Sequence, residues 1–313
     1  MRVLLTGASS FTGHWFARHL SAAGATVVAT LSGAAAGYGG GHARRLARLP
    51  PAVARIHAAP FGSDAMLAAI RAAAPLDALC HHWAHMTGYT RPDFPVEEAV
   101  AANTRNLGAV LDALREAGGT RIVVTGSYGE PGEGAGPETE RSFSPYATSK
   151  AVTFARIREA ALARGLRVDK FVIPNPFGPE EEPRFTAYLM REWAAGRVPE
   201  VRTPAYVRDN IPVGLLARAY ARLVLERPAS GPEARLAPGF YAGAQGDFAA
   251  RVAREVSART GWRCDLRLAA QTDFPEPRAR WNPDRVDAAA LGFDEAAAWD
   301  DFTRFHTSMP AAV

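Results

Sequence analysis

The first 175 residues alternate short apolar runs with amphipathic stretches, and this alternation constrains the fold more than any other feature. Five runs are typical of β-strands: residues 3–6, 26–31, 76–84, 120–127 and 167–174. Helical spacing of apolar residues lies between them, at 13–24, 63–74, 96–118 and 146–165. Such an alternation predicts an α/β protein with a doubly wound parallel sheet covered by helices on both faces.

The rhythm changes after Asn175, where Pro-rich turns separate shorter helices. We therefore expect a larger N-terminal domain over residues 1–174, joined by a returning segment around 205–226, and a smaller lobe that takes up most of 175–313. Residues 33–45 are rich in glycine and alanine and predict a flexible loop after the second strand. A final amphipathic helix should pack Trp299 and Phe302 on the smaller lobe.

Composition excludes several classes of protein. The formal charge is +4 with a pI near 9.3, but the arginines are scattered, so we expect no nucleic-acid interface. Cys80 and Cys264 lie far apart and are expected to be reduced thiols. No apolar run approaches the roughly 20 residues of a membrane span, and the first apolar run, at 3–5, is too short for the core of a signal peptide. We expect a cytoplasmic enzyme.

Residues 6–13, TGASSFTG, follow the first strand and lead into a helix. Gly7 permits a tight turn, Gly13 permits close packing of the helix, and the N–H groups at the helix start can hold a pyrophosphate. Ser10 stands where a middle glycine usually lies. The pattern predicts a dinucleotide site, although an ordinary strand-to-helix turn fits the same residues.

The end of the second strand carries no acidic residue to bind the adenosine ribose, and residues 1–63 contain no Asp or Glu. A 2′-phosphate would meet no repulsion there, and Arg44 or Arg45 could bind it. These observations favour NADP over NAD. In the alternative, Ser32 and backbone groups bind the ribose of NAD.

Tyr146 and Lys150 form the second candidate site, within SPYATSK at 144–150. Lys150 is one of only two lysines in the chain, and it lies four residues after Tyr146, on the same face of a helix. Its ammonium is expected to lower the pKa of the tyrosine toward a value useful for proton transfer. Ser127, at the end of the fourth run, is placed to hydrogen-bond a reacting oxygen. A packed tyrosine followed by a solvated lysine is the alternative.

These motifs together resemble the extended short-chain dehydrogenase/reductase family, with its Rossmann-type nucleotide-binding domain. TGASSFTG is similar to its glycine motif, LDALCHHWA (76–84) to its fourth-strand motif, and Ser127 with YATSK to its catalytic triad. NPFGP (175–179) resembles its asparagine-containing turn, and the Arg-Asp pair at 208 resembles the segment before a family helix.

The resemblance implies a role for each matching residue. Tyr146 would be the acid/base, Lys150 its support, Ser127 the residue that orients the substrate oxygen, and Asn103 a neighbour in the active site. Asn175, Arg208 and Arg278 would face the substrate's diphosphate. The NAD(P) site would be formed by Thr6, Gly7, Ser9, Ser10, Phe11, Thr12, Gly13, Ser32, Arg44, Arg45, His81, Trp83, Ala84, Tyr146, Lys150 and Pro174.

Most members of this family act on nucleotide-linked sugars, so we expect an NAD(P)-dependent epimerase working through a transient 4-keto sugar. An NADPH-dependent ketoreductase of keto-deoxysugars is the nearest alternative, and a non-catalytic NADP sensor or scaffold is the alternative of another class. Sugar 4,6-dehydratases of this family use an Asp-Glu pair to remove water. Here only Tyr128 separates Ser127 from Gly129 and no such pair follows Ser127, so the resemblance disfavours dehydration.

Other clusters predict less. His81 and His82 would point to opposite faces of a strand, so we expect no metal site with His85. Residues 180–182, EEE, are expected to form a solvated face or helix start, with the border of the substrate entrance as the alternative. Family members often dimerise through a four-helix interface, and apolar faces at 95–117 and 145–164 lead us to expect a homodimer.

Overall fold

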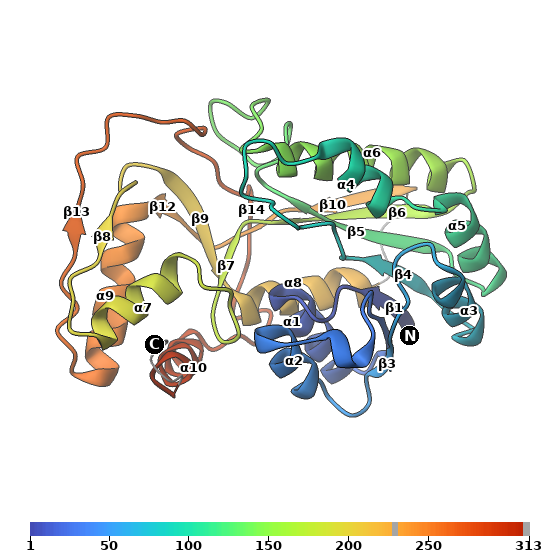
Figure 1. Cartoon of the computed structure of the whole chain (residues 1–313), viewed down its shortest axis with the longest axis horizontal. Coiled ribbons are helices and arrows are strands. Elements are labelled where there is room, and N and C mark those ends of the chain that lie inside the picture. The colour runs from blue at the N-terminus through green and yellow to red at the C-terminus, as the bar shows by residue number, and fades with distance from the viewer. Residues whose placement is uncertain (227–230, 309–313) are drawn as a thin grey trace.

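The computed structural model describes residues 1–226 and 231–308. A parallel seven-stranded sheet forms its centre, in the order β10-β6-β5-β4-β1-β2-β3 (Figure 1). Its strands are β1 (Arg2–Thr6), β2 (Thr26–Thr30), β3 (Ala54–Ile56), β4 (Ala78–His81), β5 (Arg121–Ser127), β6 (Arg167–Ile173) and β10 (Glu233–Leu236). The predicted sheet is confirmed, and it contains all five predicted strands together with β3 and β10.

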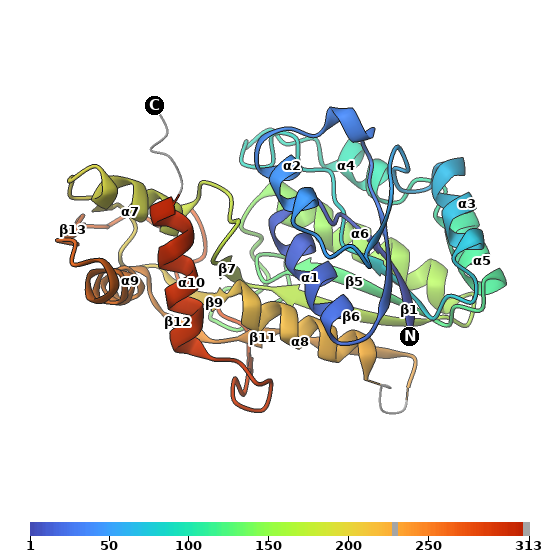
Figure 2. The same ribbon diagram turned by 90° about the horizontal axis from the view of Figure 1, so that it is seen from below.

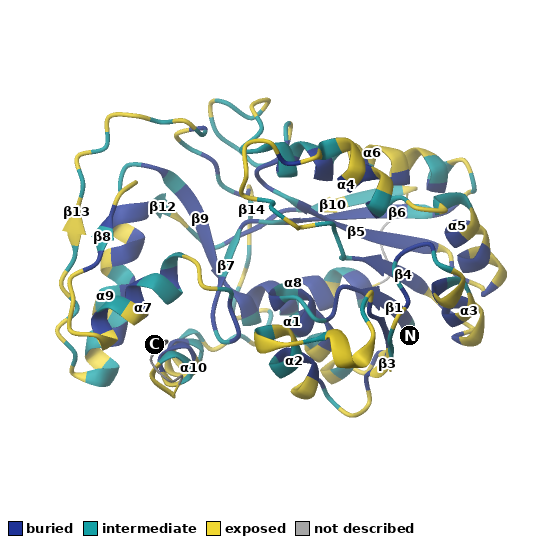
Figure 3. Ribbon diagram, in the orientation of Figure 1, coloured by how far each residue is buried: buried dark blue, intermediate teal, exposed yellow. Residues whose placement is uncertain are grey.

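Both faces of the sheet are covered because alternate residues of a strand point to opposite sides. Val3 and Leu5 of β1 pack with helices α1 (Phe11–Ala22) and α8 (Val213–Leu225). Leu4 packs on the other face, under α3 (Asp64–Ala72), α5 (Leu107–Glu116) and α6 (Pro145–Leu162). Figures 2 and 3 show α1 and α8 side by side and the buried strands between the helical layers.

Two predicted segments differ in the structure. The predicted helix over 96–118 is two helices, α4 (Val96–Asn103) and α5, because Asn106 adopts a left-handed conformation with φ of 47°. The predicted flexible loop over 33–45 contains a 3-10 turn, η1 (Ala35–Gly37), and most of helix α2 (Gly40–Ala47). Helix α2 is ordered by tertiary contacts, since its Arg45 and Leu46 are buried.

The second lobe is built on a three-stranded sheet of β7 (Asn175–Phe177), β9 (Val207–Pro212) and β12 (Tyr241–Ala244). Around it lie α7 (Phe185–Ala194), α9 (Gln245–Thr260) and α10 (Glu295–Ser308). Phe177, Trp299 and Phe302 share its core, so the predicted packing of the last helix is confirmed. Two short pairs complete the strands, β8 (Glu200–Val201) with β13 (Arg267–Leu268), and β11 (Pro238–Gly239) with β14 (Asp284–Arg285).

The connection between β6 and β7 places the second lobe. One residue, Pro174, separates the two strands, so the lobe lies at the carboxyl ends of the parallel strands (Figure 1). The chain then returns twice, with α8 against α1 and with β10 beside β6. Within the described ranges, no helix has both the length and the apolar character needed to cross a membrane.

Candidate active site

The loop between β1 and α1 is shaped by the side chain of Ser10. Ser10 caps α1: its Oγ accepts a hydrogen bond from the Gly13 N–H at 3.1 Å and donates one to the Gly7 carbonyl at 2.9 Å. A serine that replaces glycine here therefore reinforces the turn. The remaining N–H groups of the helix start are those that bind phosphate in dinucleotide-binding folds.

Two glycines of this loop cannot be replaced without displacing the backbone. Gly7 has φ of 81°, and a Cβ there would lie 2.9 Å from the Trp83 nitrogen. A Cβ at Gly13 would collide with the Gly7 carbonyl oxygen. Both predicted glycine roles are confirmed, and the resulting cradle fits the pyrophosphate of a dinucleotide.

The end of β4 is hydrogen-bonded to the phosphate loop through His82. Its Nε2 lies 3.1 Å from Ser10 Oγ and 3.0 Å from Thr12 Oγ1, and its Nδ1 lies 2.9 Å from Thr125 Oγ1. Burial, with help from Lys150 and His81, lowers the pKa of His82 to about 3, so the ring is neutral. This role of His82 was not predicted from the sequence. The alternation of side chains along a strand, which turns His81 and His82 to opposite faces, is the signal that could have indicated it.

Other residues predicted to bind the cofactor also lie at this edge of the sheet. Thr6 Oγ1 accepts hydrogen bonds from the N–H groups of His82 at 2.9 Å and Trp83 at 2.8 Å, which joins the ends of β1 and β4. His81 is fully buried, packs on Phe61 and lies 3.0 Å from the Asn103 carbonyl oxygen. His81 therefore stabilises the end of β4 from within the core. Trp83, Ala84 and Phe11 lie at the same edge, and Pro174 is buried at the end of β6.

Arg44 and Arg45, the predicted ligands of a 2′-phosphate, are bound to the second lobe. Arg44 Nε lies 2.7 Å from Glu180 Oε2, and Arg45 pairs with Glu182 at 2.7 Å. Arg45 is buried and also donates to the carbonyls of Ser9 at 2.8 Å and Glu180 at 3.0 Å.

The prediction of a solvated acidic face at 180–182 is therefore wrong. Glu180 and Glu181 are buried, and Arg48 also pairs with Glu180. Glu181 accepts hydrogen bonds from Thr186 Oγ1. Ser32, at the end of β2, is exposed.

Tyr146 and Lys150 lie on the first turns of α6, and Ser127 ends the neighbouring strand β5. Ser144 caps the helix by accepting from the Ala147 N–H at 3.2 Å, and Pro145 is its first residue, as predicted. Ser127 Oγ accepts from the Gly129 N–H at 3.2 Å, and the Ser127 N–H donates to Glu130 Oε1 at 2.6 Å. The fold thus brings a helix start and a strand end together at the carboxyl edge of the sheet.

Tyr146 is enclosed by the segment that follows β4. The rings of Tyr89 and Phe94 lie edge-on to it, with centroids 5.6 and 5.7 Å away. Burial raises the pKa of Tyr146, and the charge of Arg184 only partly opposes this. The pKa of Tyr146 is therefore raised, and not lowered as expected beside Lys150, because the phenol loses solvent on burial.

Lys150 is itself buried, so a solvated lysine is excluded. Burial lowers its pKa to about 8; the Glu130 carboxylate opposes this shift and the charge of Lys170 adds to it. At neutral pH Lys150 still carries its proton and can donate hydrogen bonds. No hydrogen bond or ion pair engages its ammonium within residues 1–226 and 231–308.

Asn103, predicted to neighbour the active site, joins two of its elements. It is fully buried; its Oδ1 accepts from the His85 N–H at 2.8 Å and its Nδ2 donates to Thr153 Oγ1 at 3.1 Å. These bonds connect the segment over Tyr146 to helix α6. Both polar groups of the side chain are therefore used to position the site.

The predicted substrate residues lie on the second lobe. Asn175 begins β7 opposite Asn210 of β9. Arg208 stacks on Tyr206 and Phe143, pairs with Glu276 at 2.9 Å and donates to the Pro277 carbonyl at 3.0 Å.

Arg278 is exposed and lies over the Phe274 ring, 5.0 Å from its centroid. Of the two predicted arginines, only Arg278 keeps a guanidinium without a carboxylate partner in the part of the chain that the structure describes.

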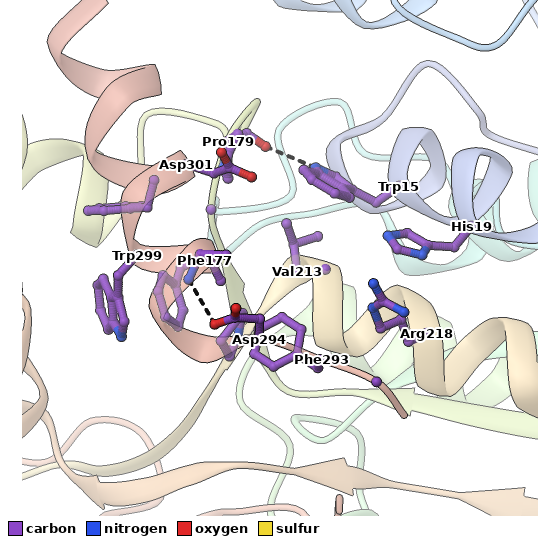
Figure 4. Close-up of a pocket in the computed structure, with 17 residues that line it drawn as sticks. Trp15, His19, Phe177, Pro179, Val213, Arg218, Phe293, Asp294, Trp299 and Asp301 are labelled. Atoms are coloured by element: carbon purple, nitrogen blue, oxygen red, sulfur yellow. Dashed lines mark hydrogen bonds between the residues drawn. The ribbon is translucent and has the colours of Figure 1, made fainter. Parts of the chain in front are cut away.

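A separate cavity of about 190 Å³ lies between α1, α8 and α10 (Figure 4). Trp15, His19, Arg218 and Asp294 are among its walls, and Trp15 donates to the Pro179 carbonyl at 2.9 Å. None of the predicted catalytic, cofactor or substrate residues lines it. The cavity is therefore distinct from the site around Tyr146.

Comparison with known proteins agrees with this geometry. The model of the family described as "NAD dependent epimerase/dehydratase family" matches residues 3–236. A search of curated proteins finds no match.

Several solved structures have the same fold. UDP-glucose 4-epimerase from Thermus thermophilus, solved with NAD, is 20% identical, with a TM-score of 0.71 over 99% of this chain and 100% of that one. UDP-glucuronic acid 4-epimerase from Bacillus cereus is 14% identical (TM-score 0.73; 98% and 99% covered). dTDP-glucose 4,6-dehydratase from Streptomyces venezuelae is 20% identical (TM-score 0.71; 98% and 97% covered).

Proposed function

Because the chain belongs to the NAD dependent epimerase/dehydratase family, we propose that it is an epimerase of a nucleotide-linked sugar. The observation that carries the proposal is the placement of Tyr146 and Lys150 on one face of α6, beside Ser127 at the end of β5 and at the same sheet edge as the Gly7–Gly13 loop. Acid/base, support and oxygen ligand thus meet where a dinucleotide would place its nicotinamide.

A bound nicotinamide would supply the acceptor and donor of hydride. Tyr146 takes the proton of the sugar hydroxyl as the carbinol is oxidised to a ketone, and returns it when the ketone is reduced on its other face. Lys150 holds positive charge beside the phenol, which stabilises the phenolate as it forms. Ser127 orients the sugar oxygen by a hydrogen bond. Asn175 and Arg278 are the residues we assign to the diphosphate.

NAD is the dinucleotide that the site favours. The NADP preference expected from the sequence rested on the missing acidic residue at the end of β2 and on Arg44 or Arg45 as ligands of a 2′-phosphate. Both arginines pair with carboxylates of the second lobe. The relatives solved with a dinucleotide contain NAD. Ser32 and backbone groups of the β2 end would bind the ribose.

Dehydration is the reaction that the site supports least. Gly129 directly follows Tyr128, and the nearest acid, Glu130, is buried and bound to Lys170 at 2.6 Å. The Glu130 carboxylate is therefore not free to protonate a leaving hydroxyl. A ketoreductase uses the same three residues and differs in releasing its oxidised cofactor.

The test begins with the purified protein denatured and its released dinucleotide identified by chromatography. Retained NAD, together with interconversion of UDP-hexose C4 epimers without added cofactor, is the expected result. An empty protein that consumes NADPH with a keto sugar would establish the ketoreductase instead. If the protein binds neither dinucleotide, both the proposed epimerase and the alternative ketoreductase are refuted.

The homodimer and the cytoplasmic location remain predictions. Helices α4 and α6 pack on each other, and Val152 on α6 is exposed, as an interface residue of the expected kind would be. Light scattering at micromolar concentration should give twice the chain mass of 33.5 kDa. A monomeric mass would contradict the dimer.

A further inference from the structure

Both lysines of the chain lie in one buried group beneath the start of α6. Lys150 is on the helix, and Lys170 is on β6, where it pairs in register with Val124 of β5. The Lys170 ammonium lies 4.3 Å from the centroid of Phe154, which is four residues after Lys150 on the same helix. All other cationic side chains except histidine are arginines, so the two lysines are a local feature.

Glu130 joins this group to Ser127. Its Oε1 accepts from the Ser127 N–H at 2.6 Å, and its Oε2 accepts from Lys170 Nζ at 2.6 Å. The carboxyl group is fully buried, and both of its oxygens act as acceptors, as an ionised carboxylate requires. Glu133 Oε1 completes the pairing of Lys170 at 2.7 Å.

The backbone is adapted to this pair. Gly126 precedes Ser127, and a Cβ there would lie 2.9 Å from Glu130 Oε1 and 2.6 Å from Lys170 Cε. Arg280 is fully buried and holds the turn that carries Glu130, by donating to the carbonyls of Tyr128 at 2.9 Å and Glu133 at 2.9 Å. The position of the carboxylate is therefore fixed from two sides.

We infer that Glu130 is a positioning residue, which fixes the backbone of Ser127 and supplies the negative charge that keeps Lys150 protonated. Lys170 holds Glu130 in place and ionised. The catalytic part of this inference rests on the proposed function. The effect of the Glu130 charge on Lys150 does not depend on that function. The charged or titratable groups around Lys150 are Tyr146 on α6, Glu130, Lys170 on β6, and His81 and His82 at the end of β4.

The presence of only two lysines allows a direct test. Protein labelled with ¹³C at the lysine ε-carbon should give two lysine resonances, assigned with a Lys170→Arg variant. In the wild type, the Lys150 resonance should titrate near pH 8. In Glu130→Gln, the midpoint should fall by about one pH unit, since a buried carboxylate no longer favours the ammonium. An unmoved midpoint would overturn the inference.

Glu133→Gln is the matched control. Glu133 pairs with the same Lys170 and with Arg235 at 2.7 Å, but Ser127 donates to Glu130. The Lys150 midpoint should stay within a few tenths of a unit in this variant. An equal fall in both variants would assign the effect to the loss of any charge in the group, and the role of Glu130 would be wrong.

Kinetics test the second part of the role. Glu130→Gln should lower kcat about tenfold, leave KM within threefold, and move the alkaline limb of the pH profile to lower pH. Glu130→Asp keeps the charge but shortens the reach to Ser127, so it should keep the Lys150 midpoint and still lower kcat severalfold. If Glu130→Gln does not fold, Glu130→Asp provides the kinetic test in its place. Full kcat in Glu130→Asp would refute the positioning of Ser127.

The titration separates this inference from the proposed function. If the protein proves not to be an epimerase, the Lys150 midpoint should still respond to Glu130 and not to Glu133. If it is an epimerase and the midpoint does not respond, the inference alone fails.

Discussion

His82 Nε2 lies 3.0 Å from Thr12 Oγ1, so the end of β4 is hydrogen-bonded to the first turn of α1. The same ring reaches Ser10 and, through Nδ1, Thr125 of β5. One neutral imidazole thus connects three neighbouring elements around the place where the pyrophosphate is expected.

Replacement of His82 by phenylalanine should weaken dinucleotide binding. The variant keeps a ring but leaves the hydroxyls of Ser10, Thr12 and Thr125 without this partner, and Ser10 caps the phosphate-binding helix. We expect the variant to lose about 1.4 kcal/mol of binding free energy, which is a tenfold higher Kd for the dinucleotide. Calorimetry would measure this Kd. His19→Phe, near the far end of α1, is the control and should bind normally; equal losses would contradict the assignment.

Tyr146→Phe should lower kcat by roughly 10²- to 10⁴-fold, because it removes the phenol that we propose exchanges the proton of the sugar hydroxyl. Dinucleotide retention should persist, as measured by chromatography after denaturation. Tyr89→Phe is the matched control, since its ring packs on Tyr146 and the change again removes one hydroxyl. Undiminished turnover of Tyr146→Phe would show that the acid/base is another residue.

Arg45→Met should destabilise the protein and weaken binding of NAD and NADP alike. It removes a buried guanidinium that binds the Ser9 carbonyl of the phosphate loop and the Glu180 carbonyl, at about 1–3 kcal/mol for each group left unpaired. Denaturant unfolding and calorimetry would measure both effects. Arg44→Met, partly exposed and paired to a carboxylate that also binds Arg48, should cost much less. A loss confined to NADP would restore the 2′-phosphate assignment.

Buried His81 should make the protein sensitive to mild acid. Burial lowers its pKa from 6.5 to about 4, so between these pH values the unfolded chain binds a proton that the folded chain does not. The stability it contributes is complete above pH 6.5, and it falls by ~1.4 kcal/mol per pH unit down to about 4.

The free energy of unfolding of His81→Gln should therefore decline less steeply over this range, by about one proton. Urea unfolding at several pH values would measure the slope. His42→Gln removes an exposed histidine and should keep the wild-type slope. An unchanged slope in His81→Gln would mean that the ring already carries its proton in the folded state.

Local sequence patterns were enough for five of the seven strands of the sheet and for the two motifs at its edge. A buried strand needs a continuous apolar run, a capped helix needs Ser144 and Pro145, and a turn at φ of 81° needs Gly7. These requirements act over a few residues, and they can therefore be recognised in the chain itself. The i, i+4 spacing of Tyr146 and Lys150 belongs to the same class, as does the packing of Trp299 and Phe302 in the last helix.

Only the tertiary structure decided which partners the charged residues have. Arg44 and Arg45 lie more than 130 residues from Glu180 and Glu182, and Glu130 lies 40 residues from Lys170. Nothing in a local pattern distinguishes an arginine that awaits a phosphate from one that holds the second lobe. Burial likewise decided the state of Tyr146, whose pKa is raised because the phenol is enclosed, with the rings of Tyr89 and Phe94 against it. Solvation and pairing depend on the whole fold, and so the sequence located the chemical groups while the structure set their electrostatic state.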